Sequence, residues 1–304
     1  MQNKFFKKNQ KKIFLTGASG KLGSYLHPFL MKKFKVLVTG NKKKISYINK
    51  INLLNNSKLK KKLNNFNPDV IVHLAAITNV DLCEKNFNLA YKTNILITNN
   101  LVNWCLENNS KIKFVYISSD QVYNNKRINT EESKTDPLNI YALSKIISED
   151  LVSQLTNSVI LRTNFFGYFP GKDGSLIDWL IKMIKKKKKT KLIIDINFNP
   201  LYVETLCKLI KKIILKKGLK GIYNLGSKNK ISKGMLLYKF AEKLGFKEDL
   251  FSFVSAKKIN FFAPRPMNMY MSVKKIEKDL EIKMPSINDE LNNLIDNLSQ
   301  RNAI

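Results

Sequence analysis

The stretch Ile13-Phe14-Leu15-Thr16-Gly17-Ala18-Ser19-Gly20-Lys21-Leu22-Gly23 decides the fold of this 304-residue chain. An apolar run typical of a buried strand leads into a glycine-rich turn, and an amphipathic helix begins at about Lys21. Gly17, Gly20 and Gly23 permit a tight turn, close approach of the backbone to a pyrophosphate, and close packing of the helix on the strand. Glycine spacing alone is a weak signal, but this strand, turn and helix context favours dinucleotide binding over a purely structural turn.

Working outward, apolar strands alternate with amphipathic helices, which is the pattern of a parallel sheet covered on both faces. The strand-like runs are 13–16, 34–39, 70–74, 112–118 and 159–162, and the helical segments between them are about 21–33, 58–66, 86–108 and 140–155. We predict an α/β fold with a doubly wound parallel sheet (Rossmann) and a smaller C-terminal substrate-binding lobe. Residues 1–164 would form the NAD(P)-binding Rossmann domain and 165–304 the lobe, with late strands near 192–195 and 221–225 rejoining the sheet of the first domain.

Composition narrows the class of protein. A hydrophobic fraction of 44% with 10% aromatic residues is ordinary for a globular chain and excludes disordered or collagen-like classes. No apolar run approaches the roughly 18 uncharged residues that span a bilayer, and residues 1–12 lack a signal-peptide pattern. We therefore expect a cytoplasmic protein without a membrane partner. Three cysteines without CxxC spacing and two separated histidines predict neither a disulfide framework nor a metal site.

The charge balance is unusual, because 54 Lys+Arg against 23 Asp+Glu give a net charge of +31. Nucleic acid, an anionic membrane or a charged substrate would be attracted to such a surface. Only four of the basic residues are arginine, however, and the lysines are spread along the whole chain, so compositional drift is favoured over specific nucleic-acid binding. A homodimer is left open.

Cofactor preference is read at the end of the second strand. The segment Thr39-Gly40-Asn41-Lys42-Lys43-Lys44 has no acid to accept bonds from the ribose 2'-OH of NAD and offers three lysines to an extra phosphate. NADP is therefore the predicted cofactor, with NADPH preferred over NADH. The cofactor-binding residues expected from the glycine loop and this segment are Gly17, Ser19, Gly20, Lys21, Leu22, Gly23, Asn41 and Lys42.

A second group of residues points to proton chemistry. On a helix, the spacing of four in Tyr141-Ala142-Leu143-Ser144-Lys145 places Tyr141 and Lys145 on one face, where the ammonium can lower the phenol pKa and reach the cofactor ribose. Ser119 ends the fourth predicted strand and can hydrogen-bond a reacting oxygen. A Tyr and Lys pair alone is more often a surface coincidence. With the glycine loop and Ser119 it predicts a catalytic set of Ser119, Tyr141 and Lys145.

With these motifs the chain resembles an extended short-chain dehydrogenase/reductase, and it is most similar to the dTDP-4-dehydrorhamnose reductase group. The resemblance runs from Lys12 to about Leu298. Besides the glycine loop and the catalytic set, it rests on the segments Pro68-Asp69-Val70-Ile71-Val72-His73-Leu74-Ala75-Ala76-Ile77-Thr78, Asn79-Val80-Asp81-Leu82-Cys83-Glu84, Ala90-Tyr91-Lys92-Thr93-Asn94, Ile117-Ser118-Ser119-Asp120-Gln121-Val122-Tyr123, Leu161-Arg162-Thr163 and Arg265-Pro266.

The resemblance implies NADPH-dependent reduction of the C4 ketone of a nucleotide-linked 4-keto-6-deoxy sugar, in cell-surface polysaccharide sugar biosynthesis. Tyr141 would protonate the alkoxide, Lys145 would tune Tyr141 and hold the ribose, and Ser119 would orient the carbonyl. The cofactor-binding residues that it adds are Asn52, Leu53, Ala75, Ala76, Thr78, Asn94, Tyr141 and Lys145. The substrate-binding residues that it implies are Asp120, Gln121, Asn164, Phe165 and Arg265.

The sequence departs from the family pattern at two places. Asn164-Phe165 stands where the reductases commonly carry a Trp that contacts the sugar nucleotide, and Asn52-Leu53 stands where they carry an acid near adenine. These changes leave the identity of the sugar and nucleotide open. Because substrate phosphates are anionic, some of Arg162, Arg265 and the local lysines are expected to face the cleft.

Three other functions are weighed against reduction. A nucleotide-sugar dehydratase needs a Glu after Asp120, where this chain has Gln121, which cannot act as a carboxylate base. An epimerase with bound NAD needs no such Glu and stays open. A noncatalytic regulatory subunit of the same fold, such as the methionine adenosyltransferase beta subunit, also stays open.

Overall fold

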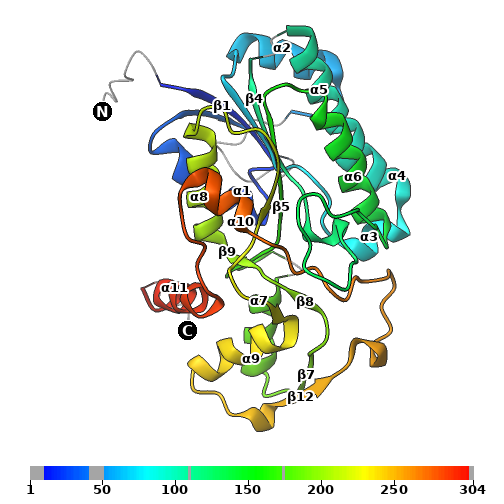
Figure 1. Cartoon of the computed structure of the whole chain (residues 1–304), viewed down its shortest axis with the longest axis vertical. Coiled ribbons are helices and arrows are strands. Elements are labelled where there is room, and N and C mark those ends of the chain that lie inside the picture. The colour runs from blue at the N-terminus through cyan, green and yellow to red at the C-terminus, as the bar shows by residue number, and fades with distance from the viewer. Residues whose placement is uncertain (1–9, 41–50, 109–110, 173–174, 301–304) are drawn as a thin grey trace.

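The computed structural model of the chain describes residues 10–40, 51–108, 111–172 and 175–300. Asn41 and Lys42, two predicted cofactor residues, lie outside this part of the chain. A six-stranded sheet in the order β2-β1-β3-β4-β5-β10 forms the centre of the molecule (Figure 1). Its strands are β1 (Lys12–Thr16), β2 (Lys35–Val38), β3 (Val70–His73), β4 (Lys113–Ile117), β5 (Ser158–Thr163) and β10 (Gly221–Leu225). All neighbouring pairs are parallel, which confirms the predicted α/β fold with a parallel sheet.

Both faces of the sheet are covered. Ile13 and Leu15 of β1 point into one hydrophobic cluster and Phe14 points into another, as the alternation of a strand requires. Helices α1 (Lys21–Met31) and α8 (Val203–Leu215) lie on one face, and α2 (Asn56–Phe66), α5 (Ile97–Asn108) and α6 (Ile140–Ser153) lie on the other (Figure 1). Burial on both sides explains why these strands read as continuous apolar runs.

The strand order places a binding crevice. After β1 the chain crosses to β2 on one side, whereas β3 returns on the other side of β1. Connections therefore leave the carboxyl ends of β1 and β3 in opposite directions, and such a switch point is where open parallel sheets bind ligands. The glycine loop follows β1 at this end of the sheet.

Part of the chain after Asn164 forms a smaller lobe at one end of the sheet, which contains α7 (Leu176–Lys185) and α9 (Lys233–Lys243) (Figure 1). The same part of the chain contributes α8 and β10 to the central layers, and it also contains α10 (Lys274–Leu280), which packs on β10, α11 (Ile287–Gln300) and three two-stranded sheets. These sheets pair β7 (Thr190–Ile193) with β12 (Phe251–Val254), β8 (Asn197–Phe198) with β11 (Ile231–Ser232), and β6 (Phe165–Phe166) with β9 (Leu201–Tyr202). Between β3 and α5 lie α3 (Val80–Lys85), α4 (Phe87–Ala90) and the π-helix η1 (Tyr91–Leu96), and three short 3-10 turns are η2 (Asp120–Val122), η3 (Glu248–Leu250) and η4 (Ala256–Lys258).

The two late strands have different fates. The segment 221–225 pairs with β5 in the central sheet, as predicted. The prediction for the segment near 192–195 is wrong, because β7 pairs with β12 inside the lobe. Leu192 is buried there among side chains of α7 and α9, and that apolar contact competes with the sheet edge. Among the described residues, no helix is long and apolar enough to cross a membrane.

Candidate active site

The glycine loop is locked against the loop that follows β3. Gly17 has a φ of +70°, and a Cβ added there would lie 2.7 Å from the Ala75 nitrogen. A Cβ on Gly23 would lie 2.3 Å from the Gly17 oxygen, so α1 can approach the loop this closely only without a side chain. Gly20 is the N-cap residue of α1 and provides no side-chain cap. The result is a bare backbone cradle at a helix N-terminus, which fits the diphosphate of a dinucleotide.

His73 links the ends of β1 and β3. Thr16 Oγ1 lies 2.7 Å from His73 Nδ1 and accepts bonds from the backbone nitrogens of Leu74 and Ala75, each at 3.1 Å. On the other side of the ring, Nε2 lies 3.0 Å from Thr98 Oγ1. Burial, with a smaller contribution from Lys145, lowers the pKa of His73 to about 3. The ring is therefore neutral and structural.

Asn94 anchors the loop that carries the predicted residues Ala75, Ala76 and Thr78. Its Oδ1 accepts from the Ile77 nitrogen at 2.7 Å, and its Nδ2 donates to the Ile77 oxygen at 3.1 Å and to Ser144 Oγ at 2.9 Å. Asn94 is buried within η1, and π-helical turns of this kind are frequent at functional sites. Its side chain thus ties the loop after β3 to the helix that carries Tyr141.

The remaining predicted cofactor residues lie around this crevice in different settings. Ser19 and Lys21 are partly buried in the glycine loop, and Leu22 is buried beneath it. Asn52 is exposed, and its Oδ1 accepts from the Leu54 nitrogen at 3.0 Å. Leu53 packs in the cluster beneath α2 and α5, so only its backbone can face a ligand.

The catalytic set predicted from sequence comes together at the carboxyl ends of the strands. Helix α6 begins beneath an Asn139 cap, whose Oδ1 accepts from the Ala142 nitrogen at 2.9 Å, and this start fixes Tyr141 in the first turn. Ser119 is the second residue after β4 and shares a side-chain hydrogen bond with Tyr141. The Lys145 Nζ lies 4.2 Å from the centroid of the Tyr116 ring. Ser119, Tyr141 and Lys145 are all buried.

Burial controls the protonation of these groups. It raises the pKa of Tyr141, against the opposing effect of the Ser119 hydrogen bond. Removal of the phenolate from water is the largest effect on this pKa, and an effect of Lys145 on the phenol stays a prediction. Burial also lowers the pKa of Lys145 to about 7, and Glu149 opposes that change. Tyr141 is thus held as a proton donor and Lys145 is poised to titrate near neutrality.

The predicted substrate residues Asp120, Gln121 and Asn164 gather beside Ser119. Asn164 Nδ2 donates to Asp120 Oδ2 at 2.8 Å, and Asn139 Nδ2 lies 3.3 Å from Gln121 Oε1. Asp120 is only 1% exposed, and burial raises its pKa to about 6.

The two other predicted substrate residues are Phe165, whose partner also follows Asn164 in the chain, and Arg265, whose partner lies on α3. Phe165 stands edge-to-face with Phe169 at a centroid separation of 6.1 Å. Arg265 forms an ion pair with Asp81 of α3, with Nη2 and Oδ1 2.8 Å apart. That pair joins the lobe to the helix beside the crevice.

Arg162, one of the basic residues of which some are expected to face the cleft, pairs inside the protein instead. Its side chain is 5% exposed and pairs with Glu149 of α6. The carboxylate satisfies the guanidinium inside the protein, so a position on β5 next to the site leaves no charge for a substrate phosphate.

Two lysines in the site region escaped the sequence analysis. The Lys172 Nζ donates to the carbonyl oxygens of Ser19 at 2.7 Å and Gly20 at 2.8 Å, so it lies on the glycine loop. Lys233, the first residue of α9, is close enough to Asp120 and Arg265 for its charge to interact with both. In a chain with so many lysines, neither carries a distinguishing sequence signal.

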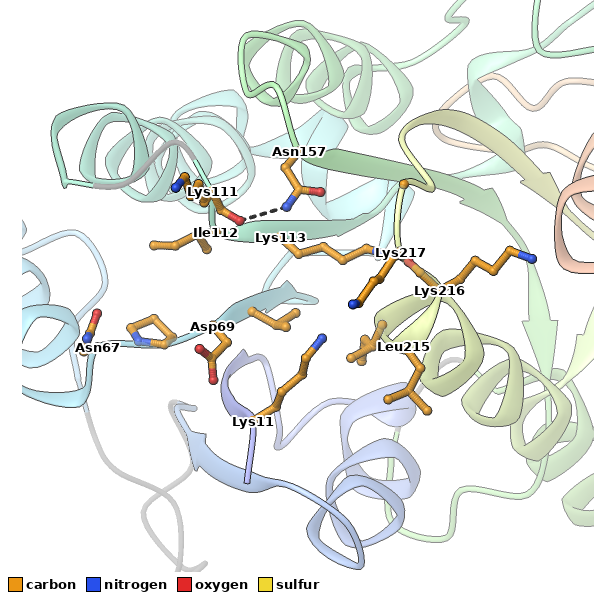
Figure 2. Close-up of a pocket in the computed structure, with 14 residues that line it drawn as sticks. Lys11, Asn67, Asp69, Lys111, Ile112, Lys113, Asn157, Leu215, Lys216 and Lys217 are labelled. Carbon is orange, nitrogen blue, oxygen red and sulfur yellow. Dashed lines mark hydrogen bonds between the residues drawn. The ribbon is translucent and has the colours of Figure 1, made fainter. Parts of the chain in front are cut away.

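A separate pocket of about 390 Å³ lies at the amino ends of the strands, whereas Ser119 lies beyond their carboxyl ends (Figure 2). The side chains of Lys11 and Lys217 point toward one another across it. Lys113 is buried in its wall, where its Nζ donates to the carbonyl oxygens of Ile213 at 2.6 Å and Lys216 at 2.7 Å, near the C-terminus of α8. None of the residues that line this pocket belongs to the predicted cofactor, catalytic or substrate site, so the pocket is distinct from the crevice described above.

A parallel sheet with a glycine loop after β1, and with Ser119, Tyr141 and Lys145 beside it, defines an NAD(P)-dependent oxidoreductase of the extended short-chain dehydrogenase/reductase class. More particularly, the chain belongs to the RmlD substrate binding domain family, whose model matches residues 11–300.

Individual relatives agree with this assignment. Spore coat polysaccharide biosynthesis protein SpsK of Bacillus subtilis is 27% identical over 273 residues, which cover 88% of this chain and 91% of that protein. The dTDP-4-dehydrorhamnose reductase of Aggregatibacter actinomycetemcomitans is 27% identical over 225 residues, covering 70% of this chain and 72% of that protein. A crystal structure of dTDP-4-dehydrorhamnose reductase from Bacillus anthracis in complex with NADP superposes with a TM-score of 0.85 at 25% identity, covering 95% of this chain and 100% of that one.

Proposed function

We propose that this protein uses NADPH to reduce the 4-keto group of a nucleotide-linked 4-keto-6-deoxy sugar during the synthesis of cell-surface polysaccharide. The observation that supports the proposal is that Ser119 and Tyr141 interact, with Lys145 one helical turn further along α6, after strands of the same parallel sheet whose β1 leads into the glycine loop. Relatives named as a dTDP-4-dehydrorhamnose reductase and a spore coat polysaccharide biosynthesis protein support the substrate class.

In this proposal one part of the chain binds the dinucleotide and the other binds the sugar nucleotide. Residues up to Asn164, with β10 added to their sheet, would hold the dinucleotide, and the glycine loop would receive its diphosphate on backbone N–H groups at the start of α1. Residues from Phe165 onward would close over the sugar nucleotide. The lysines 42–44 in the sequence support NADPH over NADH, because no carboxylate competes there with a 2'-phosphate.

The side chains then have separate tasks. When bound, the reduced nicotinamide supplies the hydride. Ser119 would donate a hydrogen bond to the sugar carbonyl oxygen and hold it in place, and Tyr141 would deliver a proton to that oxygen as negative charge develops. The raised pKa of Tyr141 suits this task, because the phenol stays protonated at neutral pH. Lys145, in its charged form, attracts the cofactor ribose and phosphates.

The same geometry argues against dehydration. Gln121 stands after Asp120 where elimination of water needs a second carboxylate, and its amide is held near Asn139. An amide cannot accept the sugar proton as a base. In this proposal the Asp120 carboxylate, with Asn164 and Lys233 around it, would instead bind sugar hydroxyls.

The test is oxidation of NADPH by the purified protein with a panel of nucleotide-linked 4-keto-6-deoxy sugars, followed by nicotinamide absorbance. NADH in place of NADPH measures cofactor preference, and Tyr141→Phe removes the proton donor. We expect oxidation with at least one sugar and a loss of about 10²- to 10⁴-fold in kcat for the variant. NADPH binding without oxidation of any sugar would contradict the proposal and point to an epimerase or a noncatalytic subunit.

A further inference from the structure

A buried ion pair lies directly behind the catalytic set. Arg162 Nη2 lies 2.6 Å from Glu149 Oε2, and Arg162 Nε lies 3.1 Å from each carboxylate oxygen. The two side chains are 5% and 4% exposed. The guanidinium and the carboxylate thus satisfy one another inside the protein.

The same carboxylate also accepts a hydrogen bond from the residue before Ser119. Ser118 Oγ donates to Glu149 Oε1 in a short hydrogen bond. Ser118 is the residue before Ser119, and Glu149 is one helical turn after Lys145 on the buried face of α6. Glu149 therefore connects the end of β4 to the helix that presents Tyr141 and Lys145.

Arg162 extends this connection to the edge of the sheet. Its Nη1 donates to Tyr123 Oη at 2.7 Å, and that hydroxyl lies 2.9 Å from the Thr130 oxygen and 3.0 Å from Asn224 Oδ1 of β10. The guanidinium is thus satisfied on both sides. It fixes the orientation of the Glu149 carboxylate from a neighbouring strand.

Stability alone is a weak reason for such a pair. Replacing a buried ion pair with well-packed apolar residues is often neutral or stabilising, since two charges lose their hydration. This pair has an additional effect, because the negative charge of Glu149 acts on Lys145 and opposes the loss of its proton on burial. A buried ammonium near nicotinamide would otherwise become neutral at lower pH.

We propose that Glu149, oriented by Arg162 and Ser118, is a positioning residue that fixes the segment after β4, with Ser119, relative to Tyr141 on α6 and places a negative charge that favours the ammonium form of Lys145. This inference rests on the proposed function for its catalytic meaning. The effect of Glu149 on Lys145 is also expected to change NADPH affinity, which can be measured without a sugar.

The experiment compares Glu149→Gln with Glu290→Gln. Glu290 is a second buried glutamate, and it accepts from Thr205 Oγ1 at 2.7 Å. It belongs to α11, which lies on the other side of the central sheet from α6 (Figure 1). For both variants and the wild type, NADPH affinity and kcat/KM are measured as functions of pH. Removal of the Glu149 charge lowers the pKa of Lys145 further, so the alkaline fall of both quantities moves to lower pH, by about one unit. At a pH above this alkaline fall, NADPH affinity and kcat/KM of Glu149→Gln are about tenfold lower than those of the wild type. Glu290→Gln keeps the wild-type pH profile.

A second variant protects the test against a folding failure. Glu149→Gln/Arg162→Gln leaves no unpaired buried charge, and it is expected to fold and to keep the shifted alkaline limb. A wild-type pH profile in the Glu149 variants, even with lower thermal stability, overturns the inference, and so does an equal shift in Glu290→Gln. If the wild type binds NADPH but reduces no sugar, the proposed reduction fails while the pH profile of NADPH affinity still decides the role of Glu149.

Discussion

At the scale of single residues, burial rather than any one partner sets the chemistry of the site. Asp120 and Lys145 lie in the same crevice region, and burial brings the pKa of the acid up to about 6 and that of the base down to about 7. Both groups therefore titrate close to physiological pH, as is typical of residues in functional sites. The protein pays for this arrangement in stability, because each charged form has lost part of its hydration.

That cost gives a prediction for Asp120→Asn. Between pH 4 and pH 6, folded Asp120 retains a proton that the unfolded chain has released, so this residue makes the wild type less stable as pH rises, by at most about 3 kcal/mol. Asparagine does not titrate. Relative to the wild type, the free energy of unfolding of Asp120→Asn should therefore increase across this window, as measured by urea denaturation at a series of pH values.

Asp195→Asn is the matched control for that experiment. Ser255 and the Ala256 nitrogen hydrogen-bond the Asp195 carboxylate, and despite opposing desolvation its pKa is lowered. Its charged form is stabilising, so Asp195→Asn should lose stability relative to the wild type as pH rises. Curves with the same sign for both variants would contradict the assignment of burial as the cause at Asp120.

How far single residues could be predicted depended on whether they belong to a local pattern. Ser119, Tyr141 and Lys145 were identified because strand-end position and helical spacing are visible in sequence. The pairing of Arg162 could not be predicted, since its partner Glu149 lies on another element and only the packing of α6 on β5 brings them together. Lys172 and Lys233 were missed for the same reason, as each reaches the crevice from a distant part of the chain.

At the scale of elements, the glycine loop shows that equal residue types can have unequal duties. A Cβ on Gly23 would meet the Gly17 oxygen at 2.3 Å and the Ala18 backbone at 2.6 Å, where nothing can move without shifting α1. A Cβ on Gly20 would meet only the Gly17 oxygen, at 3.1 Å. Packing therefore requires a glycine at position 23, whereas at position 20 a glycine is expected because it leaves access for a ligand.

Alanine substitutions should separate these duties. Gly23→Ala is expected to destabilise the fold by about 3 kcal/mol, because overpacking against backbone forces a displacement of the helix. Gly20→Ala should stay within about 1 kcal/mol of the wild type and weaken NADPH binding instead. Urea denaturation and cofactor titration of both variants check this, and equal destabilisation would contradict it.

Lys172 gives a second prediction for the same element. Its ammonium contacts the Ser19 and Gly20 carbonyl oxygens and adds positive charge where the diphosphate is expected. Lys172→Gln should weaken NADPH binding by about fivefold, or roughly 1 kcal/mol, with little change in melting temperature. Lys191→Gln, an exposed lysine of β7, is the matched control and should bind NADPH as the wild type does.

Elements with strong periodicity were predicted well, and short ones were not. Most of the central strands, and the helices α1 and α6, follow apolar patterns long enough to be predicted directly from the sequence. The pairing of β7 with β12 could not be read, because a four-residue strand carries no information about which edge it joins. Packing of α7 and α9 around Leu192 settled that choice.

At the scale of the whole molecule, the net charge of +31 must be tolerated by a folded chain. Self-repulsion of like charges destabilises a compact state, and salt screens it. The pocket at the amino ends of the strands concentrates this effect, since Lys11 and Lys217 point toward one another there (Figure 2). Burial, with a contribution from Lys11, lowers the pKa of the nearby Lys113 to about 8.

Neutralising that pocket should therefore stabilise the protein more than neutralising an ordinary surface. We expect Lys11→Gln/Lys217→Gln to raise the free energy of unfolding at low ionic strength by about 0.5 kcal/mol, and the gain to fade as salt is added. Lys186→Gln/Lys188→Gln makes the same charge change on exposed lysines after α7 and should give a smaller gain. Thermal and urea denaturation across a range of salt concentrations measure both. Equal gains in the two variants would mean that repulsion is spread evenly over the surface, whereas a loss of stability in the pocket variant would mean that these lysines contribute favourable contacts that outweigh their repulsion.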